Sequence, residues 1–196
     1  MDEDELRKAI NAILNGKCIV YPTDTLYGLG AQVSNDQAIT SIYNIKKRPL
    51  SLPLPIAVAN MSMLKSCVHL TPLAIKLSHH FFPGKITLVC EKKDLISDRI
   101  SSGKKTVAIR IPDDSIALSI IKKTGPLVST SANIHGQKTP ETISEIRKLF
   151  KPGIVEVFVD DGPRKGKPST IVDVTGSHPK ILRTGSIPEN EILNGE

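Results

Sequence analysis

The hydrophobic positions at the N-terminal end of the chain follow two patterns in turn. The first is the spacing of an amphipathic helix, which is formed by Leu6, Ile10, Ile13 and Leu14. Gly16 follows at a position where helices commonly end. The run 18–21 is then continuously apolar and short, and Pro22 closes it, as is typical of a buried strand. We therefore expect a helix followed directly by a strand.

The same two patterns alternate along the rest of the chain. Helical spacing predicts helices from about 36 to 48, and over 72–81, 115–123 and 142–150. Short apolar runs predict strands at 56–58, 86–90, 106–111, 127–130, 155–159, 170–174 and 180–183. Several of these strands follow one another with no helix between them. This order favours a mixed α/β sheet over a purely parallel one.

Three of the predicted helices begin with residues that favour N-terminal capping. The segment 34–37 is interpreted as a capping box. Thr71 precedes Pro72, which suits the first helical position because proline has no backbone N–H to leave unpaired. Thr142 and Glu145 have the spacing of a second capping box.

Composition and charge are those of a globular chain with a positive field. The 196 residues favour one domain, 1–196, and 39% are hydrophobic. The formal net charge of +6 would attract nucleotides, phosphates or RNA, although a solvated basic surface explains it equally well. Only 4% of residues are aromatic, which argues against base stacking as a way to bind single-stranded nucleic acid.

Cysteine and histidine positions indicate no metal site. Cys18, Cys67 and Cys90 are far apart and are expected to be buried thiols in a reducing compartment. The histidines have no ligand spacing with carboxylates. The N-terminus is acidic, and no apolar run reaches the length of a membrane span, so we expect a cytoplasmic protein without membrane partners.

The common phosphate-binding loops are not found. Gly28-Leu29-Gly30 follows a strand, as in dinucleotide-binding proteins, but the third glycine is missing and no helix starts at once. There is no P-loop either. Any ATP site must therefore be built in another way.

Polar residues at the ends of predicted elements are candidate ligand contacts, and each also has an ordinary explanation. They are Thr23, Asp24 and Thr25 after a strand, Lys46 and Arg48 at a helix end, and Ser131 and Asn133 after a strand. Such residues also form capped turns, and cations at a helix end complement the helix dipole. Arg110 and Arg183 end apolar strands, where a charge usually has a partner or a ligand.

Taken together, these segments resemble the YrdC-like domain family, which is found in threonylcarbamoyl-AMP synthases. The resemblance runs from about Leu6 to Ile187. It rests on seven blocks in the family's order, at 21–30, 46–49, 82–88, 107–112, 129–136, 168–173 and 181–183. The resemblance implies the family's twisted mixed β-sheet with surrounding helices and one concave basic face.

The resemblance also implies a reaction. L-threonine and bicarbonate combine to a carbamate, which attacks the α-phosphorus of ATP to give threonylcarbamoyl-AMP and pyrophosphate. A partner complex then transfers the group to an adenosine of tRNA. Mg²⁺ is expected with ATP, held mainly by phosphates.

Site residues follow from the same resemblance. The family's catalytic signature falls on Lys46, Arg48, Ser131 and Asn133. Threonine is expected at Thr25, Arg110, Ser129 and Ser169, with Arg110 facing its carboxylate. The nucleotide is expected at Arg48, Thr106, Ser131, Asn133, Thr139 and Arg183. Three positions, Leu52, Ala57 and His135, differ from the residues that many family members carry, which bears on substrate affinity.

The rival hypothesis is an RNA-binding or ribosome-associated factor without catalysis. The net charge of +6 supports it, through backbone contacts to tRNA or double-stranded RNA. The paired signature of lysine, arginine, serine and asparagine favours the enzyme, because binding RNA phosphates does not require it.

Overall fold

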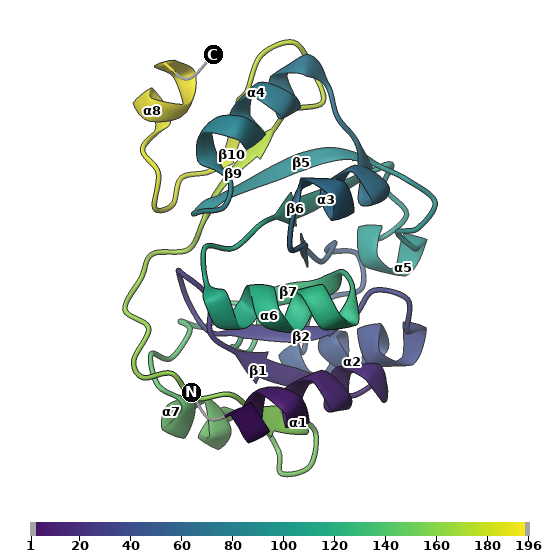
Figure 1. Ribbon diagram of the computed structural model, residues 1–196, viewed down its shortest axis with the longest axis vertical. Helices are drawn as coiled ribbons and strands as arrows, with labels where there is room; N and C mark the ends of the chain where they lie inside the picture. The colour runs from purple at the N-terminus through teal and green to yellow at the C-terminus, as the bar shows by residue number, and fades with distance from the viewer. Residues whose placement is uncertain (1–2, 195–196) are drawn as a thin grey trace.

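A mixed β-sheet runs through the part of the chain that the structure describes, residues 3–194 of a computed structural model (Figure 1). Met1 and Asp2, at the acidic N-terminus, lie outside the described residues. The helices are α1 (Glu3–Leu14), α2 (Asp36–Lys46), α3 (Met61–Cys67), α4 (Pro72–Phe81), α5 (Asp98–Ser101), α6 (Ser115–Thr124), α7 (Ile143–Leu149) and α8 (Glu189–Asn194). The strands are β1 (Ile19–Tyr21), β2 (Gly28–Gln32), β3 (Ile56–Ala57), β4 (Val68–His69), β5 (Ile86–Lys92), β6 (Thr106–Arg110), β7 (Leu127–Ser131), β8 (Val157–Phe158), β9 (Thr170–Asp173) and β10 (Lys180–Arg183).

The strand order confirms the mixed sheet. It is β10-β9-β5-β6-β3-β7-β2-β1-β8, and β4 pairs with β5. The pairs β1–β8, β3–β6 and β5–β9 are parallel, whereas the other pairs are antiparallel. Because β9 follows β8 in the chain but lies beside β5, the C-terminal strands extend the far end of the sheet.

Most of the predicted helix caps are present. Thr71 caps α4 with Pro72 in the first turn, and Thr142 and Glu145 form the capping box of α7. The capping box at 34–37 is wrong, because Asn35 is the capping residue of α2 and its side chain accepts from the N–H of Ala38.

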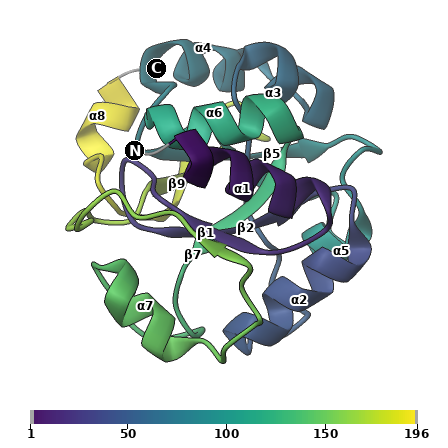
Figure 2. The same cartoon turned by 60° about the horizontal axis from the view of Figure 1, so that its bottom comes forward.

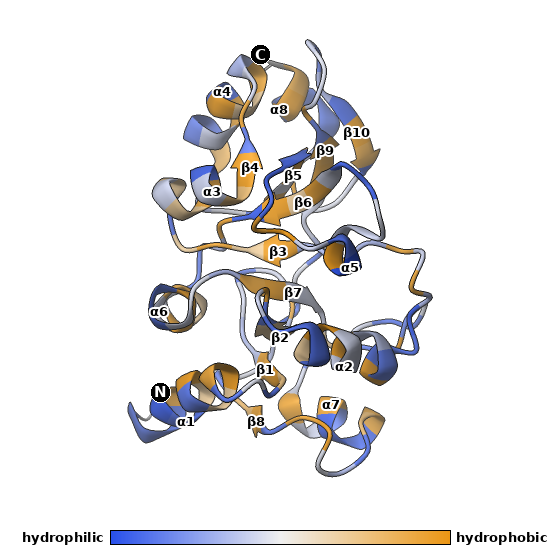
Figure 3. Ribbon diagram, turned by 90° about the vertical axis from the view of Figure 1, so that its right-hand side faces the viewer, coloured by the Kyte–Doolittle hydropathy of each residue, from blue (hydrophilic) through white to orange (hydrophobic). Residues whose placement is uncertain are grey.

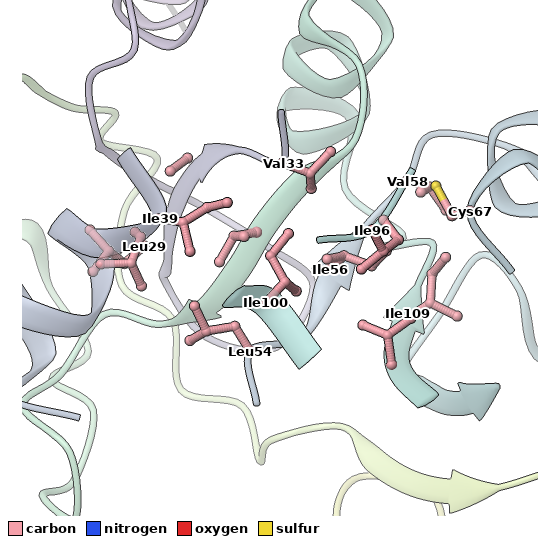
Figure 4. Close-up of a cluster of buried hydrophobic side chains, with 14 of the residues drawn as sticks. Leu29, Val33, Ile39, Leu54, Ile56, Val58, Cys67, Ile96, Ile100 and Ile109 are labelled. Carbon is pink, nitrogen blue, oxygen red and sulfur yellow. The ribbon is translucent and has the colours of Figure 1, made fainter. Parts of the chain in front are cut away.

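Helices cover both faces of the sheet (Figure 2), and the buried hydrophobic side chains form two clusters. Helices α1 and α6 pack on one face, where Ile19 and Tyr21 of β1 point. The neighbouring Val20 points to the other face, into the larger cluster that α2 covers. Figure 4 shows part of that larger cluster, in which Leu29, Ile56 and Ile109 come from different strands. The alternation of Ile19, Val20 and Tyr21 between the two faces is the two-residue period expected of a strand that is buried on both faces.

Strand β2 was not predicted, because its two glycines disfavour a strand. The structure explains them by the ring of Tyr21, which lies over β2 from β1. A Cβ at Gly28 would lie 3.2 Å from Cε1 of that ring, and a Cβ at Gly30 would lie 2.7 Å from the same atom. The glycines therefore make room for an aromatic ring and do not form a phosphate loop.

The three cysteines are buried and free, as predicted. Burial raises the pKa of the Cys18 and Cys90 thiols to about 12, so both remain protonated at neutral pH.

Strands β3 and β6 are coloured as hydrophobic in Figure 3, and α1 is hydrophilic over much of one side. Among the described residues, we find no helix that is long and apolar enough to cross a membrane.

The contact between Gly30 and Tyr21 gives a test of the fold. The variant Gly30→Ala places a methyl group against a fully buried ring, so overpacking should lower the free energy of unfolding by about 1–3 kcal/mol. Gly176→Ala is the matched control, because that exposed glycine has open space around it and should change stability by less than about 0.5 kcal/mol. Urea unfolding measures both. Equal stability of the two variants would contradict the packing described here.

Candidate functional site

A cavity of about 500 Å³ lies beside the strands at the centre of the sheet. Strands β2, β3, β5, β6, β7, β9 and β10 contribute to its wall, together with the segments 23–27, 137–141 and 164–169. Most of the predicted site residues line it, namely Thr25, Arg110, Ser129, Ser131, Asn133, Thr139, Ser169 and Arg183. The structure thus brings together residues that lie far apart in the sequence.

Thr106 is not brought to this cavity. It begins β6 and pairs with Glu91, whereas Arg110 ends the same strand at the cavity. Four residues of extended chain put about 13 Å between the two. Thr106 therefore lies outside this cavity lining, at the opposite end of β6 from Arg110, and its nucleotide contact stays a prediction.

Lys46 is buried behind the cavity wall. Its side chain is 1% exposed, and its Nζ donates to Asn133 O and Asn133 Oδ1, both at 2.9 Å, and to Ser131 O. An ammonium group has three N–H donors, so these three oxygens use all of them. Burial, and secondarily the charge of Arg48, lower the pKa of Lys46 to about 7. The lysine holds the end of β7 and has no donor left for a ligand.

Arg48 also lies outside the cavity lining. Its guanidinium donates to Leu52 O at 3.2 Å and to Pro53 O at 2.9 Å, and its Nη1 lies 3.3 Å from His135 Nδ1. The backbone N–H of His135 in turn donates to Lys46 O at 2.7 Å. Lys46 and Arg48 therefore join the end of α2 to the loop that follows β7, and are not explained by the helix dipole alone.

Arg110 is held from three sides and keeps two donors free. Its Nε donates to Gly84 O at 3.0 Å, Nη1 to Thr25 Oγ1 at 3.0 Å and Nη2 to Asp24 Oδ1 at 2.6 Å. A guanidinium has five N–H donors, so two remain for a ligand in the cavity. Asp24 is itself 8% exposed, and its charge offsets the cost of burying the arginine.

The hydroxyl of Thr25 acts as an acceptor. Thr23 Oγ1 donates its single proton to Leu26 O at 2.6 Å and accepts from the backbone N–H groups of Thr25 and Leu26, both at 3.3 Å, so it has no proton for the Thr25 hydroxyl 3.1 Å away. One lone pair of Thr25 Oγ1 accepts from Arg110. The other lone pair remains for an N–H or O–H group of a ligand.

Ser131 and Asn133 form a closed network with Lys46. The hydroxyl of Ser131 donates to Asn133 Oδ1 at 2.6 Å, and the amide of Asn133 donates to Ile134 O at 3.0 Å and to Gln137 O. With Lys46, every donor and acceptor of the Asn133 side chain has a partner. Asn133 therefore fixes the loop, and Ser131 faces a ligand with its lone pairs.

Arg183, at the end of β10, adds a further positive charge to the cavity wall. Arg183 donates to Ser169 O at 2.8 Å, and Ser169 Oγ lies 2.7 Å from Thr87 Oγ1. Burial, and secondarily the charge of Arg110, lower the pKa of Arg183. Arg183 has no ion pair within residues 3–194. A bound anion would relieve the repulsion between the two arginines.

Several further lining residues, one on β5 and the others on loops, were not identified from the sequence. Thr87, Gln137, Lys138, Glu141, Arg164 and Lys167 also face the cavity. The segment 160–168, which we call the strap, passes so close to Thr25 that a Cβ at Gly166 would lie 2.3 Å from Thr25 O. Arg164 anchors the strap through Asp114 at 3.2 Å. The loop-like run of basic residues, glycine and proline at 164–168 was the available signal.

Fold and cavity together define an α/β protein with a site for a small anionic ligand rich in hydrogen-bonding groups. The profile of the Sua5/YciO/YrdC family, described as telomere recombination, matches residues 11–185. The chain therefore belongs to the Sua5/YciO/YrdC family, in agreement with the resemblance stated above.

Relatives and solved structures support the assignment. A Methanocaldococcus jannaschii protein is 38% identical over 96% of this chain and 91% of its own length. Threonylcarbamoyl-AMP synthases of Pyrococcus abyssi and Bacillus subtilis are 36% and 33% identical, and the chain spans just over half of their lengths, 57% and 56%.

Among solved structures, P. abyssi Sua5 complexed with L-threonine superposes with a TM-score of 0.94 at 34% identity, covering 100% of this chain and 58% of that one. Escherichia coli YciO has a TM-score of 0.89 at 25% identity, covering 98% and 94%. The similarity therefore extends over the whole of this chain.

Burial of Lys46 predicts a pH dependence of stability. A lysine with a pKa of about 7 in the folded state and 10.5 unfolded binds fewer protons when folded between those values, so its cost to stability decreases as pH rises. Between pH 7 and 8.5, the free energy of unfolding of the wild type should rise by about 1–2 kcal/mol relative to Lys46→Met. Lys8→Met, an exposed lysine of α1, should follow the wild type. Parallel curves for the wild type and Lys46→Met in urea unfolding would refute the desolvation of Lys46.

Proposed function

We propose that this chain is a threonylcarbamoyl-AMP synthase, a nucleotidyltransferase that uses L-threonine, bicarbonate and ATP with Mg²⁺. The observation that carries the proposal is the single cavity shared by two sets of residues. The set expected to bind threonine comprises Thr25, Arg110, Ser129 and Ser169, and the set expected near the nucleotide includes Ser131, Thr139 and Arg183. Two substrates that react with each other need such a common site.

The proposed chemistry is an in-line transfer at phosphorus. The amino nitrogen of threonine forms a bond to the carbon of bicarbonate with loss of water, which gives a carbamate. A carbamate oxygen then attacks the α-phosphorus of ATP, and the bond to the bridging oxygen breaks. Pyrophosphate leaves with that electron pair. Positioning and charge neutralisation supply most of the catalysis in such reactions.

The cavity residues suit these two tasks. The two free N–H groups of Arg110 match a carboxylate, whereas the cations Lys138, Arg164, Lys167 and Arg183 are in place to attract phosphates. Glu141 is the one carboxylate-bearing side chain among the described lining residues, so Mg²⁺ would enter as part of the ATP substrate, held mainly by phosphate oxygens.

The four signature residues take different parts in this proposal. Ser131 contacts the substrates directly through its hydroxyl oxygen. Lys46 and Asn133 act through Ser131, because their polar groups are occupied within the protein. Arg48 supports the same loop through His135. Downstream, the adenylate is an activated acyl group that a separate transfer complex would carry to tRNA.

Substrate requirements test the proposal directly. Pyrophosphate release should need ATP, Mg²⁺, bicarbonate and L-threonine together. Valine has the shape of threonine without its hydroxyl, so a site that pairs that hydroxyl should turn it over at least about a hundredfold more slowly. The measurement is a coupled pyrophosphate assay with bicarbonate-free buffer as the control. Equal rates with valine and threonine would count against the proposal.

Ligand titrations separate the enzyme from the rival RNA-binding factor. A nucleotide site should bind ATP with Mg²⁺ saturably and raise the melting temperature by mass action. Backbone binding of an RNA duplex should instead weaken steeply with salt, because counterions are released. Thermal shift with ATP, threonine and a short duplex tests both. Lack of response to ATP and threonine, with steeply salt-dependent RNA binding, would favour the RNA-binding factor.

A further inference from the structure

A buried hydroxyl outside the cavity lining contacts one of its residues. Tyr21 of β1 is fully buried, and its hydroxyl donates to Ser129 Oγ on β7 at 2.5 Å. Strand β2 lies between these two strands, since Tyr21 pairs with Gly28 and Gly30 pairs with Ser129. The tyrosine therefore reaches across a whole strand to a serine of the cavity wall.

The direction of this hydrogen bond follows from the surroundings of Tyr21. Burial raises the pKa of its phenol to about 12, so the group keeps its proton at neutral pH. Ser129 Oγ is its one hydrogen-bond partner among the described residues. A buried O–H without an acceptor is costly, so the phenol donates and the serine oxygen accepts.

The proton of Ser129 is then directed elsewhere. No acceptor for it is found within residues 3–194, and Ser129 lines the cavity. Ser129 is therefore a donor toward a ligand, as are the two free N–H groups of Arg110. Thr25 presents a lone pair, as described above. The cavity wall thus has hydrogen-bond donors at Ser129 and Arg110 and a hydrogen-bond acceptor at Thr25.

We propose that Tyr21 is a positioning residue, whose hydroxyl fixes Ser129 as a hydrogen-bond donor for the carboxylate of the substrate amino acid. This inference rests on the proposed function for the identity of the substrate. It gives the amino acid one orientation, with its carboxylate toward Ser129 and Arg110 and its N–H or O–H groups toward Thr25. Gly28 and Gly30 of β2 contribute to the same arrangement, because they leave room for the ring of Tyr21.

The variant Tyr21→Phe tests this role, because it keeps the ring over Gly28 and Gly30 and removes only the hydroxyl. The dissociation constant for threonine should rise about tenfold, as expected for one lost hydrogen bond. The dissociation constant for ATP should stay within about twofold, and kcat at saturating threonine should change little. The measurements are calorimetric titration and steady-state kinetics.

Two further variants separate positioning from general destabilisation. Tyr43→Phe removes another buried hydroxyl, bonded to Leu52 O and Arg99 O, and should leave threonine affinity unchanged. Because Tyr21 acts through Ser129, Tyr21→Phe combined with Ser129→Ala should bind threonine no more weakly than Ser129→Ala alone. Additive losses, equal losses for ATP and threonine, or unchanged threonine affinity in Tyr21→Phe would overturn the proposal.

A spectroscopic measurement without ligand keeps this inference separate from the proposed function. The hydroxyl proton of Tyr21 is buried and takes part in a short hydrogen bond, so it should give a downfield proton NMR resonance that is absent in Tyr21→Phe and shifts upfield in Ser129→Ala. An unchanged resonance in Ser129→Ala would overturn the inference, whatever the substrate. If the wild type shows this resonance but binds no threonine, the proposed function fails and the assigned direction of the Tyr21–Ser129 bond stands.

Discussion

The register between β2 and β7 is the constraint on which the site depends. Gly28 pairs with Ser131 and Gly30 with Ser129, so both serines point to one face of the sheet. A slip by one residue would turn them to the other face, away from Tyr21. The same register places the end of β7 where Lys46 can hold it from the side of α2. Packing of a ring against two glycines thus determines where the polar groups of the cavity lie.

Much of the fold follows from local patterns, and the exceptions have physical causes. The helices predicted at 72–81 and 115–123 carry clear apolar faces, and the structure confirms them as α4 and α6. Strand β2 was missed because the function of its glycines is visible only once Tyr21 lies beside them. The short helices α3, α5 and α8 carry too few turns for a periodic pattern, and tertiary contacts stabilise such elements more than their own sequences do.

The sequence predicted which residues line the cavity better than it predicted how their hydrogen bonds are directed. Arg110 and Ser129 lie at the cavity as expected, yet their hydrogen bonds depend on Asp24 and Tyr21, which lie in the segment after β1 and at the end of β1. Lys46 illustrates the limit most clearly. A lysine at a helix end is normally solvated, and only the folded chain shows that it is buried against three oxygens. The sequence carries the residue types, whereas the direction of each donor depends on neighbours that are distant along the chain.

The long sequence separations within the site have a consequence for how the chain acquires activity. Asp24 and Arg110 are 86 residues apart, Lys46 and Ser131 are 85 apart, and Tyr21 and Ser129 are 108 apart. Contacts that close such large loops form late and make folding slow, because chain entropy is lost before they form. A partly folded intermediate would therefore have native helices and no working site. Ser169 and Arg183 are also the last of these residues to leave the ribosome, so a nascent chain would complete its cavity only after Arg183 has emerged.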